Sequence, residues 1–210
     1  DHGANRLGAS ALMQGLADGY FVLPYTIQNY LSDQIQVPRF STDAPEFAAA
    51  EKEINDKIDR LMKIQGKRSV DSIHRELGLV MWDFVGMGRT AEGLKTGLAR
   101  IQEIRKAFWS DVFIPGKKDD FNVELEKALR LADFIEIGEL MARDALNREE
   151  SCGGHFREEY QTPEGEALRQ DDKFSYVSCW EFQGEGKEPK MYKEPLDYEF
   201  VVRQTRNYKA

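Results

Sequence analysis

The amino-acid sequence predicts a mainly α-helical protein, built as an up-and-down helical bundle with a further helix before it and a small β-rich appendage after it. Over most of positions 44–148, apolar residues recur every three or four residues, which is the period of an amphipathic helix. After position 170, aromatic residues alternate with polar or small ones, which is the period of a strand. The two patterns occupy separate parts of the chain, so we expect the helices and strands to be segregated.

The first expected element is a helix over residues 9–31. Its residues from Ala9 onward favour helix formation, and Pro24 removes a backbone donor and is expected to kink it. Apolar and aromatic side chains surround nearly every face between Tyr20 and Leu31. A helix that is apolar all round is normally buried. We therefore expect exposed apolar surface here if the covering partner is absent.

The helix expected from about residue 44 to Gly66 opens the bundle. Thr42 or Asp43 is the predicted cap, and Pro45 suits the first turn. Gly66 is expected to end the helix. Its predicted buried stripe follows the three-to-four spacing and consists of Phe47, Ala50, Ile54, Ile58 and Leu61.

Three more helices are expected, each introduced by a residue type that caps helix N-termini: Ser69, Thr90 and Asn122. Short turns join them, and helices joined by short turns pack antiparallel. Two predicted core stripes are Val70, Ile73, Leu77, Val80, Met81, Phe84 and Val85, and then Leu94, Leu98, Ile101, Ile104 and Phe108.

The tail changes period. Phe174, Tyr176, Trp180 and Phe182 alternate with polar or small residues, and Gly184-Glu-Gly186 is a turn signal. Residues 190–193 are expected to pair back as a hairpin. A further alternation from Leu196 to Val202 predicts a third extended run.

Composition excludes several classes of protein. The 210 residues carry a net charge of -8, which argues against nucleic acid as a main partner. Two cysteines cannot form a disulfide framework. No run of about 18 apolar residues is present, so we expect no direct membrane span.

The first line of the sequence, HGANRLG followed by a helix, is the best candidate for a site. The unpaired N–H groups of a helix start suit an anion or a developing negative charge. Arg6, just before that start, has a planar fork of donors that fits a carboxylate. The same residues also fit an ordinary helix entry with a surface arginine.

Three blocks resemble the flavoprotein subunits of succinate dehydrogenase and fumarate reductase. HGANRLGASALM at residues 2–13 is similar to the family's HGANRLGGNSLL. Residues 79–94 are similar to its MWxxVGxxR…GL stretch, and residues 148–159 to its RxESRGAHxRxD. The blocks stand in family order and span nearly the whole chain.

The resemblance implies a C-terminal part of such a subunit, inactive alone, because most of the FAD site precedes this segment in the family. The parent would interconvert succinate and fumarate on FAD and pass electrons to an iron–sulfur subunit and quinone. It would lie on the cytoplasmic side of the inner membrane, held there by iron–sulfur and membrane anchor subunits. The implied domains are 1–43 (end of the FAD-binding domain), 44–150 (helical bundle) and 151–210 (β-containing appendage).

The same resemblance implies the site residues. Arg6 stands where the family arginine binds a substrate carboxylate. Ala11 and Leu12, with Ser10, stand in the segment that contacts the flavin ring, with backbone N–H groups toward its N1–C2=O edge. The chain departs from the family here: Ser10 replaces Asn and Ala11 replaces Ser. A backbone contact survives this change, whereas a hydroxyl contact at position 11 does not.

The two cysteines and three histidines do not have the spacing of a metal site, and no metal is expected. Cys152 and His155 as nucleophile and base is an equally weak reading. Two alternatives remain for the function: a fragment of an enzyme similar to L-aspartate oxidase, or a helical interaction module without catalysis.

Overall fold

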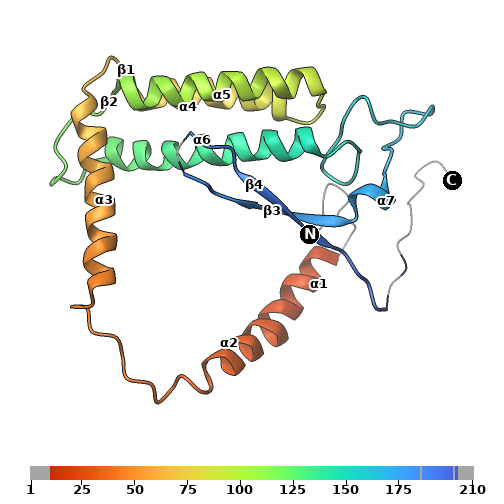
Figure 1. Cartoon of the computed structure of the whole chain (residues 1–210), viewed down its shortest axis with the longest axis horizontal. Coiled ribbons are helices and arrows are strands. Elements are labelled where there is room, and N and C mark those ends of the chain that lie inside the picture. Colours follow the sequence, from red (N-terminus) through yellow and green to blue (C-terminus); the bar gives the residue numbers. More distant parts are fainter. Residues whose placement is uncertain (1–9, 185, 201, 203–210) are drawn as a thin grey trace.

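The computed structural model describes residues 10–184, 186–200 and 202, and it is mainly helical, as predicted (Figure 1). Its N-terminal part is one helical run that begins with α1 (Ser10–Ala17), passes through the π-helix η1 (Asp18–Val22) and ends with α2 (Leu23–Leu31). The distortion expected at Pro24 is the π-helical turn immediately before it. Such wide turns relieve a break in the regular hydrogen-bond ladder.

Helix α3 (Pro45–Ile64) begins at Pro45, as predicted, but its capping residue is Ala44, without a side-chain hydrogen bond. The predicted cap at Thr42 or Asp43 is therefore wrong. The Asp43 carboxylate instead accepts a hydrogen bond from Ser41 Oγ at 3.1 Å, so it is used within the preceding turn.

The end of α3 also differs in detail from the expectation. Gln65, rather than Gly66, has the left-handed conformation that closes the helix, with φ 48°. Gly66 serves another purpose: a Cβ there would lie 2.1 Å from the backbone carbonyl of Asp111. The glycine is needed because two backbones meet at that point.

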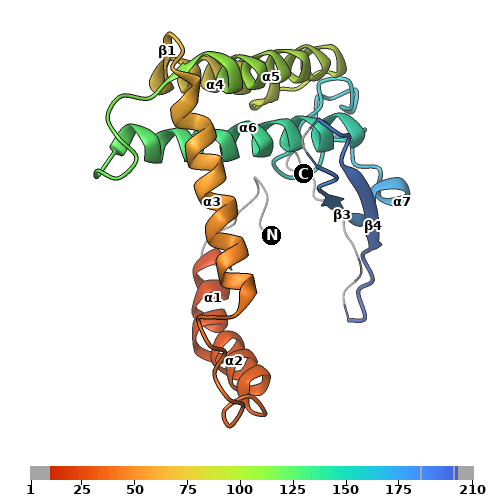
Figure 2. The ribbon, with the colours of Figure 1, turned by 60° about the vertical axis from the view of Figure 1, so that its left-hand side comes forward.

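The side chains of Ser69, Thr90 and Asn122 cap the next three helices, as predicted, by accepting hydrogen bonds from the N–H groups of Ser72, Gly93 and Leu125. These helices are α4 (Val70–Val85), α5 (Ala91–Asp111) and α6 (Val123–Asn147). They lie side by side, and α3 crosses one end of the group (Figures 1 and 2).

A short parallel pair fixes that end. Strand β1 (Arg68–Ser69) precedes α4 and pairs with β2 (Val112–Phe113), which follows α5. The start of α4 therefore lies beside the end of α5, so the two helices are antiparallel. This pair of two-residue strands has no signal in the sequence pattern.

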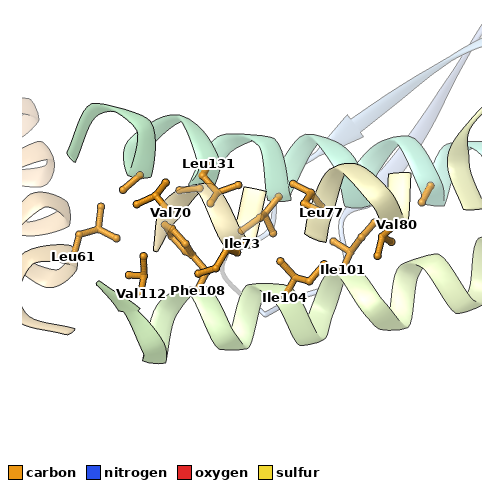
Figure 3. Packing of buried hydrophobic residues seen from close by; sticks show 14 of the residues in the cluster. Leu61, Val70, Ile73, Leu77, Val80, Ile101, Ile104, Phe108, Val112 and Leu131 are labelled. Carbon is orange, nitrogen blue, oxygen red and sulfur yellow. The ribbon is translucent and has the colours of Figure 1, made fainter. Parts of the chain in front are cut away.

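The core runs along the inside of these helices (Figure 3). Most of the predicted stripe residues of α4 and α5 are buried, and Met81, Phe84 and Leu98 pack against the core at its edge. The hydrophobic side chains with no exposed surface are Ile73, Leu94, Ile101, Phe108, Val112, Ala128 and Ala142.

The stripe predicted for α3 is wrong except at its end. Leu61 is buried, but Phe47 and Ile54 are 53% and 55% exposed. The reason is that α3 crosses one end of the group and the rest of the helix extends away from it (Figure 2).

The tail forms the predicted hairpin. After the short helix α7 (Asp171–Phe174), strand β3 (Tyr176–Glu181) pairs antiparallel with β4 (Lys190–Pro195). The third alternating run forms no strand over residues 196–200 and 202. This run follows Pro195, and after the hydrogen bond from the Leu196 N–H to the Ser175 carbonyl it forms no ladder with any described strand, so alternation alone does not produce a sheet. No helix within the described residues is both long and apolar enough to cross a membrane.

Candidate functional site

The residues predicted to bind substrate and flavin lie at the N-terminal end of the chain. Arg6 falls within residues 1–9, outside the described part of the structure. Ser10, Ala11 and Leu12 are the first described residues of α1, and they are helical, as predicted. Leu12 is 77% exposed.

The helical run that carries this turn has no cover in the described structure. None of residues 11–31 is buried, and α1 and α2 stand away from both the bundle and the hairpin (Figures 1 and 2). The exposed side chains occur on all sides and include Leu12, Leu16, Tyr20, Phe21, Leu23, Tyr25, Ile27 and Tyr30. This is the expected exposed apolar surface.

The other two motif blocks, far apart in the sequence, meet at the end of the bundle. The N–H of Arg89 donates to the carbonyl of Phe156 at 3.1 Å, and the N–H of Glu158 donates to the carbonyl of Arg89 at 2.8 Å. The Arg89 side chain also donates from Nε to the carbonyls of Val85 and Gly86, both at 3.0 Å. Arg89 thus closes α4 and holds the later block against it.

His155 lies between two arginines. Its Nδ1 is 2.8 Å from Arg89 Nη1, and its Nε2 is 2.8 Å from the carbonyl oxygen of Arg148. A guanidinium only donates and a carbonyl only accepts, so Nδ1 must accept and Nε2 must carry the hydrogen. His155 is therefore the neutral Nε2–H tautomer.

The surroundings of His155 oppose its protonation. Burial lowers the pKa of His155 below its ordinary value of 6.5, and the positive charges of Arg89, Arg157 and Arg148 lower the pKa further. The hydrogen bond to the Arg148 carbonyl acts in the other direction but does not reverse the shift.

Arg157 is buried at the C-terminal end of α6, with 2% of its surface exposed. Its Nη1 donates to the carbonyls of Ala145 at 2.9 Å and Leu146 at 3.2 Å. These carbonyls belong to the last helical turn, which has no partner within the helix. Arg157 Nε forms an ion pair with Glu159 at 3.2 Å, which compensates for burying the charge.

Ser151 and Arg148 complete the cluster. Ser151 Oγ, fully buried, accepts from the Arg157 N–H at 2.8 Å and donates to its carbonyl at 3.0 Å. Arg148 pairs with the buried Glu150 at 2.9 Å and donates to the carbonyl of Tyr176 at 2.9 Å. The cluster therefore ties the bundle to the hairpin.

This cluster is built for support rather than for catalysis. Both ring nitrogens of His155 are engaged, so the ring has no lone pair free to activate the Cys152 thiol. Burial also raises the pKa of Cys152, which disfavours the thiolate. Within the described residues, no three His, Cys, Asp or Glu side chains are grouped to hold a metal. Reasoning from the sequence missed the contact of Arg89 with His155, although both lie in motif blocks.

The helical bundle and its paired blocks define a class of domain: the helical C-terminal domain of flavoprotein subunits. Residues 74–208 match the sequence model of the family described as "Fumarate reductase flavoprotein C-term". The chain belongs to this family.

Curated relatives agree. The chain is 29% identical over 156 residues to the fumarate reductase flavoprotein subunit of Serratia sp. (strain ATCC 39006), a match that covers 74% of this chain and 25% of the relative. It is 28% identical over 159 residues to the succinate dehydrogenase flavoprotein subunit of Rickettsia bellii, covering 76% and 25%. The chain therefore spans about a quarter of the length of these relatives.

Solved structures share the fold. An E. coli quinol fumarate reductase variant superposes with a TM-score of 0.67 at 23% identity, over 81% of this chain and 28% of that chain. Adenylylsulfate reductase from Archaeoglobus fulgidus gives a TM-score of 0.60 at 13% identity, over 84% and 28%. The same fold thus occurs in oxidoreductases with different named activities, so fold alone does not decide the substrate.

Proposed function

We propose that this chain is the C-terminal part of the flavoprotein subunit of a succinate dehydrogenase or fumarate reductase. The observation that carries the proposal is the family match over residues 74–208, together with HGANRLG ahead of it. The whole subunit would interconvert succinate and fumarate on FAD. It would pass electrons to an iron–sulfur subunit and quinone, and this chain alone would be inactive.

In this proposal Arg6 binds a carboxylate of the dicarboxylate substrate. Its permanent charge and forked donors suit bidentate binding of a carboxylate. Holding the substrate in the correct orientation toward the flavin would lower the barrier to hydride transfer. FAD, when bound by the intact subunit, supplies the acceptor or donor of the hydride. Arg6 would hold the substrate in position for that transfer.

The first turn of α1 would contact the flavin through its backbone. In this proposal the helix starts at this point, so that the N–H groups of Ser10, Ala11 and Leu12 would have no partner within the helix and would lie at its positive end. Such donors fit a negatively charged flavin edge. Neither the alanine at position 11 nor the departure from the family pattern at position 10 removes these donors.

The exposed apolar run of α1, η1 and α2 would pack against the preceding, flavin-binding part of the subunit. A continuous apolar surface of this kind marks an interaction site, and about three quarters of the length of the relatives has no counterpart in this chain. The assembled subunit would lie on the cytoplasmic side of the inner membrane, peripheral through its iron–sulfur and anchor partners.

The first test identifies the parent. An antibody raised against this chain would be used to isolate the native protein, and its mass, flavin content and activities would be measured. We expect a much larger flavin-containing band that reduces fumarate or oxidises succinate. Oxidation of aspartate instead would assign it to enzymes similar to L-aspartate oxidase. A flavin-free band of the size of this chain would contradict catalysis.

The second test addresses Arg6 in that parent. Arg6→Lys keeps the charge but loses the fork, so turnover should fall by about 100-fold while flavin content stays unchanged. The matched control is Arg39→Lys, an exposed arginine in the loop after α2, which should keep wild-type kinetics. Normal turnover in Arg6→Lys would refute the assigned role.

A further inference from the structure

A cleft of about 520 Å³ lies between helices α5 and α6 and the β3–β4 hairpin, and its lining includes none of the residues assigned to the site proposed above. We call it the hairpin cleft. Its volume is in the range of pockets that hold small organic ligands. The apolar part of its lining comes from α6 and from the hairpin: Ile137, Leu140, Trp180, Phe182 and Pro189.

Polar contacts to α6 hold the hairpin wall of the cleft in place. Trp180 Nε1 donates to Asp144 Oδ1 at 2.8 Å, which fixes the orientation of the indole ring. Arg143 binds Glu188 with both terminal nitrogens, Nη2 to Oε1 at 3.0 Å and Nη1 to Oε2. The aromatic wall is therefore preformed and needs no ligand to create it.

The two arginines that line the cleft are already paired with carboxylates. Arg105 and Arg143 share the nearly buried Glu139, and Arg105 also binds Glu136 through two bonds of 3.0 and 2.9 Å. These guanidiniums are thus already neutralised.

Lys106 and Lys187 line the same cleft, and neither forms an ion pair within the described part of the chain. The described residues that line the cleft include four cations and three carboxylates, although the chain as a whole has a net charge of -8. An ammonium group without a carboxylate beside an apolar wall attracts an anion that has an apolar body.

We propose that the hairpin cleft binds a small amphipathic anion, with a planar apolar body and one carboxylate group. The body packs against Trp180 and the α6 wall, and the carboxylate pairs with Lys106 and Lys187. This binding is independent of the flavin reaction proposed above, so either proposal can fail without the other.

The test uses the whole chain labelled with ¹⁵N-tryptophan and titrated with 2-naphthoate. The chain has three tryptophans, Trp82, Trp109 and Trp180, so the indole N–H signals report separately on three places. We expect a saturable shift of the Trp180 signal, assigned with Trp180→Phe, while the other two signals stay in place. 2-Naphthalenemethanol, a neutral ligand of the same shape, should bind at least about tenfold more weakly.

Variants separate the cleft from general apolar association. The double change Lys106→Glu and Lys187→Glu should weaken 2-naphthoate binding at least about tenfold. The matched control, Lys63→Glu with Lys95→Glu, changes two exposed lysines that do not line the cleft and should not affect binding.

Ile137→Trp, at a position 54% exposed, should fill the cleft and abolish the shift without a loss of folding. Three results would overturn the proposal. They are the absence of a saturable Trp180 shift, equal movement of all three indole signals, and equal affinity for the charged and neutral ligands.

Discussion

Two apolar regions of this chain are covered very differently. In the α4–α6 bundle, Ile73, Leu94 and Phe108 have no exposed surface, whereas Leu12 and Tyr30 in the α1–α2 run are 77% and 78% exposed. The bundle helices carry their apolar residues in a stripe, which neighbouring helices of the same chain can cover. The N-terminal run is apolar on all sides, and a helix of that kind needs partners all round.

Apolar content therefore does not measure stability in this molecule. Buried apolar side chains stabilise the folded state, whereas exposed ones contribute little until a partner covers them. The bundle is therefore expected to determine the free energy of unfolding of the isolated chain. The N-terminal run is expected to determine what the chain binds.

The largest difference should come from matched phenylalanine truncations. Phe108→Ala removes a fully buried ring and should lower the free energy of unfolding by about 3–5 kcal/mol. Phe21→Ala removes a ring that is 65% exposed and should change it by less than about 0.5 kcal/mol. Urea denaturation followed by circular dichroism measures both. Equal losses would break the comparison, because the N-terminal run would then contribute to the core.

A smaller loss is expected at the polar end of the bundle. Arg157→Leu leaves the carbonyls of Ala145 and Leu146 without their donor and should cost about 2–3 kcal/mol. Arg130→Leu is the control, because Arg130 is largely exposed and its one ion pair among the described residues is with Glu126 on its own helix. A loss for Arg130→Leu as large as for Arg157→Leu would mean that burial is not the cause.

The free energy of unfolding should also depend on pH through His155, which belongs to the same polar cluster. The folded-state pKa of His155 is below its value in the unfolded chain, about 6.5, so between these two values the unfolded state binds more protons. The free energy of unfolding should therefore increase as the pH rises from the folded-state pKa of His155 to about 6.5. Acidification through the same range should remove this contribution to stability.

His155→Gln tests this assignment, because an amide can accept from Arg89 and donate to the Arg148 carbonyl without titrating. We expect a flatter stability profile between about pH 5 and 7. His74→Gln, at an exposed histidine that stacks on Phe134, should keep the wild-type profile. If His155→Gln has the same dependence of stability on pH as the wild type, groups other than His155 cause the pH effect.

The smallest effect should distinguish a used cap from an unused one. Ser69 Oγ accepts the Ser72 N–H at 3.2 Å, so Ser69→Ala should cost about 1 kcal/mol. Asp43 does not cap α3, and Asp43→Ala should cost less than about 0.5 kcal/mol. Thermal unfolding of both variants measures the two losses of stability. A larger loss for Asp43→Ala would support Asp43 as the cap of α3, as the sequence predicted.

Several elements could be predicted because their signals are local. The caps at Ser69, Thr90 and Asn122 involve residues three positions apart, within a single turn. The hairpin also followed from alternation and a glycine-rich turn. The third alternating run failed because a strand needs a neighbour to accept its hydrogen bonds, which is not a local property.

The candidate site was predictable only in part. The helical conformation of residues 10–12 agrees with the prediction, whereas the roles of Arg6, Ala11 and Leu12 come from resemblance and stay predictions. The ion pairs of the hairpin cleft had no signal at all, since Glu188 reaches Arg143 across 45 residues.

The helical fold class, helices α4, α5 and α6, and most of the buried faces of α4 and α5 follow from the sequence, because a turn of helix and its cap depend on residues three or four positions apart. Two contacts follow only from the folded chain. Arg89 is hydrogen-bonded to His155, 66 residues away, and Arg157 donates to main-chain carbonyls at the C-terminal end of α6. Their partners include main-chain carbonyls, which every residue carries. No spacing rule can select one of them before the chain is folded.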